Sequence, residues 1–270
     1  MCMAFIASKS WQRRIHETVT INKKMKRVLE TYGENGVIEI QGNPQETILY
    51  LSDKPIQYSW LAEVGSTWRY HIAQGLNNPI VKLHDGITDM LKRGISNEGE
   101  FLAITEFFIP FFKFGKYEFG HYKLFDDISW IEIPETEDYK SFDYYGGCFD
   151  IAPTQNSIDE NLVEEYKEAI LRGSRPTIVI LHVENSFKFF ILDGHHKFIA
   201  YQKAKIDANS IVISKLGNDY KSLDETLKIA KQMKCENKEY LKWMEREKSN
   251  MKYYKGRTME LKNIFSEMKY

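Results

Sequence analysis

Residues 193–197 read Asp-Gly-His-His-Lys and place an acid, a glycine, two imidazoles and an ammonium group side by side. They follow an apolar and aromatic run, residues 187–192, and precede residues 198–204, whose pattern predicts a helix. A strand that leads into a helix through this turn brings these groups to the helix start, where free backbone N–H groups and the helix dipole attract anions. The order of residue types therefore predicts a site for an anionic ligand.

Each residue of the turn has a role that fits such a ligand. Gly194 has no Cβ and lets another backbone segment or a phosphate approach closely. His196 and Lys197 can donate hydrogen bonds, and Asp193 can hold a metal ion or orient a hydroxyl group. The alternative is a surface turn in which Asp193 only caps the helix. No third ligand accompanies His195 and His196, so the pair does not predict a zinc site.

The composition is that of an ordinary globular protein. The chain has 270 residues, 43% hydrophobic and 28% charged, with a net charge of −1, which argues against a globally basic nucleic-acid binder. Three widely separated cysteines form no Cys-x-x-Cys pair and indicate a reduced, cytoplasmic setting. No run approaches the roughly 20 apolar residues of a membrane span. We therefore expect a cytoplasmic protein without a membrane partner.

The first half of the chain carries weaker signals. Residues 1–36 are predicted to be a helical or flexible extension, and residues 37–140 an α+β region without a recognisable role. Within that region the pattern predicts strands near 37–62, a helix over 80–92, and strands again at 101–112 and 128–133. The acidic stretch 135–138 is the expected domain boundary.

The second half has sharper signals. Ser157 and Glu160 have the spacing of a capping box, and the helix that follows is expected to end at Gly173. Two β-rich runs, 177–183 and 187–192, flank a hairpin turn, and Ile211–Ile213 forms another strand. Residues 144–216 are thus predicted to be an α+β domain, followed by a helical C-terminal tail, 218–270.

The tail has an excess of basic residues interleaved with aromatic ones, and two interpretations remain open for it. Basic charge beside Trp243, Tyr253 and Tyr254 is typical of a nucleic-acid-binding face. The same pattern also describes the solvated side of a helical hairpin.

Residues 151–214 resemble the ParB/sulfiredoxin superfamily domain. The similarity lies in a strand ending at Pro153, a helix ending at a glycine, a strand led by Pro176, and a hairpin strand that ends in the Asp-Gly-His-His signature at 193–196. The superfamily includes chromosome-partition nucleotide switches, sulfiredoxins, nucleases and free serine kinases, and the motif is most similar to that of the kinase-like members. The resemblance implies a mixed α+β fold.

The resemblance also implies a bound nucleotide, ATP or another, with its phosphates at the helix start and Mg²⁺ at Asp193. By position, Gly194, His195, His196 and Lys197 would form the phosphate-binding group. Lys197 stands where the superfamily usually has arginine, and lysine keeps the charge but loses the bidentate fork.

The implied activity depends on two further departures from the pattern. His195 occupies the position of the sulfiredoxin cysteine, which argues against reduction of sulfinic acids. Gln155 occupies the position of the proposed kinase base, and an amide can orient a hydroxyl but cannot take its proton. Asp193, His195 and Gln155 are therefore the candidate catalytic residues.

Three hypotheses follow. The first is an ATP- or ADP-dependent phosphotransferase or nucleotide hydrolase acting on a small-molecule acceptor. The second is a non-catalytic, nucleotide-gated module associated with DNA, which would bind nucleic acid through its basic C-terminal helices. The third is an interaction domain whose pocket has lost its ligand. The oligomeric state is not predicted.

Overall fold

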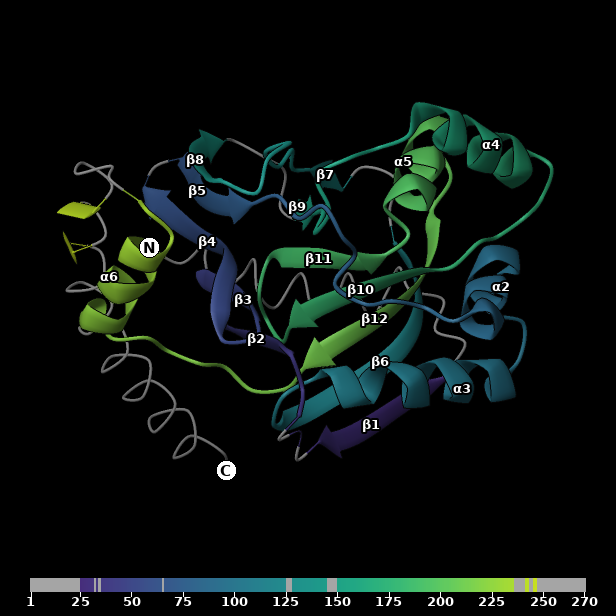
Figure 1. Ribbon diagram of the computed structural model, residues 1–270, viewed down its shortest axis with the longest axis horizontal. Coiled ribbons are helices and arrows are strands. Elements are labelled where there is room, and N and C mark those ends of the chain that lie inside the picture. Colours follow the sequence, from purple (N-terminus) through teal and green to yellow (C-terminus); the bar gives the residue numbers. More distant parts are fainter. Residues whose placement is uncertain are drawn as a thin grey trace, which may run out of the picture. The chain divides into compact units, whose positions relative to one another are not determined.

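The computed structural model describes residues 25–31, 33, 35–64, 66–124, 128–144, 150–235, 241–242 and 245–246. It has an α+β fold, as predicted, and divides into two compact units, Met1–Asp219 and Tyr220–Tyr270. Among the described residues of the first unit, the strands form one sheet of seven and one of five (Figure 1).

The seven-stranded sheet is mixed. Parallel pairs join β10 to β12, β11 to β9 and β9 to β7, whereas the remaining neighbours are antiparallel. In spatial order, the strands are β1 (Lys26–Thr31), β6 (Gly115–Leu124), β12 (Ala208–Lys215), β10 (Ile178–Val183), β11 (Lys188–Asp193), β9 (Asp150–Ala152) and β7 (Ser129–Trp130).

The five-stranded sheet is antiparallel throughout. Its first four strands follow one another in the chain, and the fifth joins from a distant segment. The strands are β2 (Ile38–Gly42), β3 (Glu46–Leu51), β4 (Lys54–Val64), β5 (Ser66–Gln74) and β8 (Tyr139–Tyr144).

Helices cover both faces of the seven-stranded sheet. They are α2 (Asp85–Arg93), α3 (Glu98–Phe108), the short 3₁₀ helix η1 (Ile109–Phe111), α4 (Glu160–Leu171) and α5 (His195–Ala204); α6 (Leu223–Gln232) belongs to the second unit. Figure 1 shows α4 and α5 side by side, with α2 and α3 apart from them. None of the described helices is long and apolar enough to cross a membrane.

Two apolar clusters follow from the alternation of side chains along the central strands. On one face, Val179, Leu181 and Val183 of β10 pack with α2, α3 and the five-stranded sheet. On the other face, Ile178 and Ile180 pack with α4 and α5. Successive side chains of a strand point to opposite faces, so a strand buried on both sides is largely apolar, as β10 is apart from His182.

Several local predictions are confirmed. The strands around residues 184–186 pair as an antiparallel hairpin, with Asn185 in the left-handed conformation at φ 65°. The helix after residue 194 and the strand around 211–213 are α5 and β12. The helix expected after the capping box also forms, but its cap is Asp159, whose carboxylate accepts hydrogen bonds from the N–H groups of Asn161 and Leu162. Ser157 is therefore not the cap.

The prediction of a strand at 101–112 is wrong, because this segment forms α3 and η1. Asn97 caps α3, and the buried residues Phe101, Ile104, Thr105 and Phe108 recur at helical spacing. The helix expected over 80–92 begins only at Asp85, after the cap His84. Apolar runs of this length fit a strand and a buried helix equally well, and the cap decides between them.

The expected boundary at 135–138 does not separate two sheets. Strand β6, from the 37–140 region, pairs with β12 along Gly115–Leu124, so both predicted domains share one sheet. Strand β1 also corrects the helical assignment of the 1–36 extension, since it pairs with β6. Residues 1–24, and all of the C-terminal tail after 235 except four residues, lie outside the described residues.

A buried ion pair joins the two sheets. Arg69 on β5 donates a hydrogen bond to the Asp150 carboxylate on β9, and Lys188 Nζ on β11 lies 3.6 Å from the same carboxylate. All three side chains are at most 2% exposed. Charges this deeply buried need one another, because each alone would lose its hydration without compensation.

We expect Asp150→Ala to lower the free energy of unfolding by about 3–5 kcal/mol, because it leaves the buried Arg69 guanidinium without its carboxylate. Glu168→Ala is the matched control. It removes an exposed helical carboxylate that pairs with Arg172 and should cost less than about 1 kcal/mol. Chemical denaturation of both variants tests this, and equal losses would contradict the assigned role of the buried pair.

Candidate functional site

The turn between β11 and α5 needs a glycine for reasons of packing. Gly194 has φ 96° and ψ 31°, in the left-handed region that favours glycine. A Cβ at this position would lie 2.8 Å from Ile178 Cγ2 and 3.2 Å from Ile178 Cα. The missing Cβ therefore makes room for β10. The sequence predicted that another backbone segment or a phosphate approaches Gly194 closely, and the structure shows the first of these in the approach of Ile178.

The start of α5 has no side-chain cap. Gly194 is its N-cap residue, so Asp193 is not the cap. By contrast, side chains of His84, Asn97, Asp159 and Ser222 cap α2, α3, α4 and α6. The first N–H groups of a helix have no acceptor within the helix itself. At α5 they keep their capacity to bind an anion.

His195 is buried and acts as a hydrogen-bond acceptor. Its Nε2 accepts from the Thr154 backbone N–H at 3.0 Å, and the Thr154 hydroxyl donates to the Ile191 carbonyl at 2.7 Å. Burial lowers the pKa of His195 to about 3, and nearby His196 and Lys197 contribute in the same direction. The ring is therefore neutral, with its proton on Nδ1, because Nε2 accepts a hydrogen bond.

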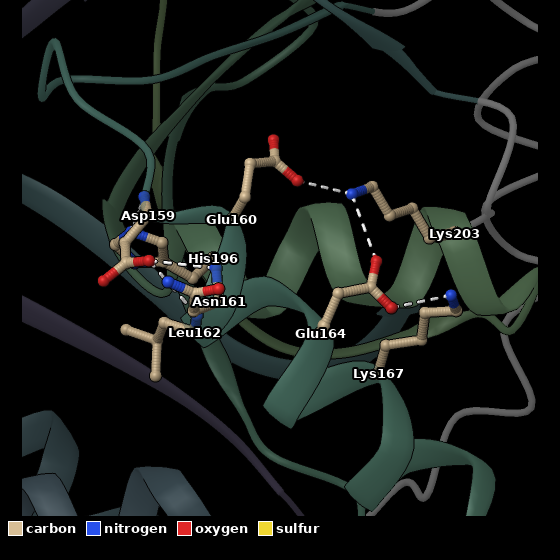
Figure 2. Close-up of polar contacts among 8 residues, drawn as sticks. All are labelled: Asp159, Glu160, Asn161, Leu162, Glu164, Lys167, His196 and Lys203. Carbon is tan, nitrogen blue, oxygen red and sulfur yellow. Dashed lines mark hydrogen bonds and ion pairs between the residues drawn. The ribbon is translucent and has the colours of Figure 1, made fainter.

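His196 joins the starts of two helices. Its Nε2 accepts from the backbone N–H of Asp159, the cap of α4, at 3.0 Å (Figure 2). Desolvation lowers the pKa of His196, opposed by the charges of Asp159, Asp193 and Glu160. Further along, Lys203 of α5 pairs with both Glu160 and Glu164 of α4 (Figure 2). These contacts hold α4 and α5 together beside the turn.

Lys197 is only 7% exposed and fully engaged within the protein. Its Nζ lies 2.9 Å from Asp193 Oδ2 and donates to the Thr177 carbonyl oxygen at 3.2 Å. Asp193, the acidic partner in this ion pair, is 25% exposed. The side chains of both residues thus stabilise the turn, and their charges largely compensate one another.

A pocket of about 210 Å³ opens at this turn. It brings together all six predicted site residues, since Gln155 lines it as well; the Gln155 amide donates to the Ser157 carbonyl oxygen at 3.0 Å. The remaining walls come from α2, the segment before it, α4 and the end of β11. Those lining residues are Pro79, Leu83, Thr88, Lys92, Leu162, Tyr166 and Leu192.

Sequence reasoning missed the contribution of α2. Thr88 and Lys92 belong to a region without any recognised motif, and they reach the pocket only through tertiary packing. Tyr166 of α4 is half-buried at the pocket wall, and desolvation raises its pKa. No local pattern distinguishes these residues from ordinary surface or core positions.

The metal-binding capacity of the site is modest. Within the described part of the chain, no group of three or more His, Cys, Asp or Glu side chains could hold a metal ion. Asp193 supplies one carboxylate at the pocket. One carboxylate together with substrate phosphates is a common arrangement for Mg²⁺, so the residues present fit this ion only beside a phosphate ligand.

Comparison with known protein families, with curated proteins and with solved structures finds no match for this chain.

Substituting Gly194 by alanine should destabilise the protein by about 2–4 kcal/mol, because a left-handed backbone and a clash with Ile178 act together. Gly173 has a similar φ, 102°, but nothing lies within 4 Å of its added Cβ. Gly173→Ala therefore isolates the backbone term and should cost about 1 kcal/mol. Denaturant unfolding measures the loss of stability in each variant. Equal losses would contradict the role of Gly194 in packing against Ile178.

The stability of the protein should fall in acid partly because His195 must stay neutral. Its pKa is about 3 in the folded protein and near 6.5 when exposed, so its contribution is complete above pH 6.5 and is lost as the pH falls toward 3. Between pH 6.5 and 5.0 this loss should amount to about 1.5 kcal/mol. His195→Gln keeps an acceptor for Thr154 without titrating, so its stability should fall less than that of the wild type. Urea unfolding at several pH values measures both proteins. If the free energy of unfolding fell with pH by the same amount in the wild type and in His195→Gln, this expectation would be contradicted.

Proposed function

We propose that the protein binds a phosphate-bearing ligand, with ATP or another nucleotide as the first candidate, at the start of α5. One observation carries this proposal: a helix start without a side-chain cap opens onto a pocket that Lys92 and Lys197 also line. Free N–H groups, the helix dipole and the ammonium group of Lys92 all favour a negative charge at the pocket, whereas the charge of Lys197 is largely compensated by Asp193.

The balance of charge supports an anion rather than a cation. Asp193 is the only carboxylate among the described lining residues, and Lys197 already pairs with it. The two histidines use their Nε2 atoms as acceptors for backbone N–H groups, so both are neutral in this arrangement. What remains to attract a ligand is the positive potential of α5 and the charge of Lys92.

The size of the pocket indicates which part of a nucleotide it would enclose. Pockets that surround a whole drug-sized ligand have volumes of roughly 300–1,000 Å³. At about 210 Å³, this one suits a phosphate chain with a small adjoining group. The apolar wall of Pro79, Leu83, Leu162 and Tyr166 suits that adjoining group, and the base would lie toward the open rim.

Phosphoryl transfer to a small-molecule acceptor is the activity proposed for this site. Such transfer depends mainly on positioning and on neutralisation of charge, so it does not require a strong base. Gln155 can orient an acceptor hydroxyl, whereas the low pKa of His195 makes that ring a poor base. Mg²⁺ held by Asp193 and the phosphates would neutralise the charge that develops in the reaction.

The resemblance of residues 151–214 to the ParB/sulfiredoxin superfamily supports the same ligand, because that superfamily binds nucleotides after its signature turn. The alternative DNA-associated module stays a prediction. Most of the basic tail that would contact DNA lies outside the described residues, and no observed feature favours it.

Wild-type protein should bind ATP and pyrophosphate in EDTA, as measured by titration calorimetry. Gln155→Glu should weaken this binding about three- to tenfold, because it adds a negative charge to the pocket wall. Gln45→Glu is the control: it adds the same charge in the turn between β2 and β3, away from the pocket, and should leave affinity unchanged. Absence of binding to the wild type, or equal affinity of the two variants, would refute the proposed site.

A further inference from the structure

We propose that Lys92 of α2 is a second phosphate-binding residue, and that the ligand of the pocket therefore carries at least two linked phosphate groups. The inference rests on the proposed function and extends it. It assigns a role in ligand binding to the region before residue 140, for which the sequence indicates none.

Lys92 is the cation at the pocket that has no competing partner within the described residues. Lys197 pairs with Asp193, and the neighbouring Arg93 pairs with Glu100. Lys92 is exposed and lines the pocket, and no carboxylate of the described segments forms an ion pair with it. Its ammonium group is therefore available to an incoming anion.

One residue fixes the end of α2 against the site. The Thr177 N–H donates to the Leu91 carbonyl oxygen at 2.8 Å, and the Thr177 hydroxyl accepts from the Ile95 N–H at 3.2 Å. The Thr177 carbonyl oxygen accepts from Lys197 Nζ. Thr177 thus connects the last turn of α2 directly to the Asp193–Lys197 ion pair.

The backbone after α2 is equally constrained. Gly94 has φ 91°, and a Cβ there would lie 2.2 Å from the Arg175 carbonyl oxygen. Leu91 is completely buried in the core. With Leu91 and Gly94 held on either side, the backbone of Lys92 has a defined position at the pocket, and only its side chain is free to move.

The two sources of positive charge differ in kind. The α5 start offers backbone N–H groups in a rigid array, which suit one phosphate group. Lys92 offers a compact ammonium on a flexible stem, which can follow a second phosphate group. A single phosphate group would have to divide its oxygens between the two. A diphosphate or triphosphate satisfies both, so the arrangement favours nucleoside diphosphates and triphosphates over monophosphates.

The test compares pyrophosphate with inorganic phosphate by titration calorimetry on the full chain at constant ionic strength. Lys92→Ala should weaken pyrophosphate binding about tenfold, the loss expected for one charged hydrogen bond. It should change phosphate binding less than about twofold. Lys92→Arg keeps the charge and should restore most of the pyrophosphate affinity. Lys82→Ala removes another exposed lysine, one that lies outside the pocket lining, and should have no effect.

The outcomes separate this inference from the proposed function. If the wild type binds neither anion, the proposed function fails and this inference fails with it. If the wild type binds pyrophosphate and Lys92→Ala binds it equally well, the site stands and the role of Lys92 is refuted. Equal losses in Lys92→Ala and Lys82→Ala would also refute it, because they would reflect the general charge of the surface. Thermal unfolding of each variant verifies that it is folded.

Discussion

The arrangement of the site depends on one buried ammonium group. Lys197 is almost completely withdrawn from water, and a buried charge is tolerated only when it is paired and hydrogen-bonded. Asp193 and the Thr177 carbonyl oxygen meet that requirement from the ends of two neighbouring strands. The turn between β11 and α5 therefore has one stable geometry, and the start of α5 points where that geometry directs it.

This constraint changes the meaning of the signature residues. All five residues that were expected to act on a ligand are engaged at least partly inside the protein. Gly194 makes room for Ile178, His195 binds Thr154, His196 binds Asp159, and Lys197 pairs with Asp193. What the turn leaves available for the proposed ligand is mainly backbone N–H groups, whose positions these side chains hold in place.

The first half of the chain belongs to the same architecture. Strand β6 extends the central sheet, and α2 and α3 cover the face of that sheet opposite α4 and α5. The two sheets are joined by the buried carboxylate of Asp150 between Arg69 and Lys188. A pocket walled by α2, α4 and the α5 start is the consequence, since elements on both sides of β10 meet near residue 177.

Local signals in the sequence were sufficient for the β10–β11 hairpin, α5, β12 and the turn at 193–197. Each of these depends on interactions between residues near one another in the chain: alternating apolar side chains, a left-handed Asn185, and a glycine before a helix. The same local reasoning failed at 101–112, where an apolar run fits a strand as well as a buried helix.

The sequence by itself determined the α+β class and the residues of the signature turn, because both follow from short-range patterns. Only the tertiary structure decided that β6 pairs with β12, that Thr177 connects α2 to Lys197, and that Lys92 lines the pocket. These contacts join segments far apart in the chain. Which segments meet is decided by the packing of both buried faces of one sheet, and no local pattern encodes that packing.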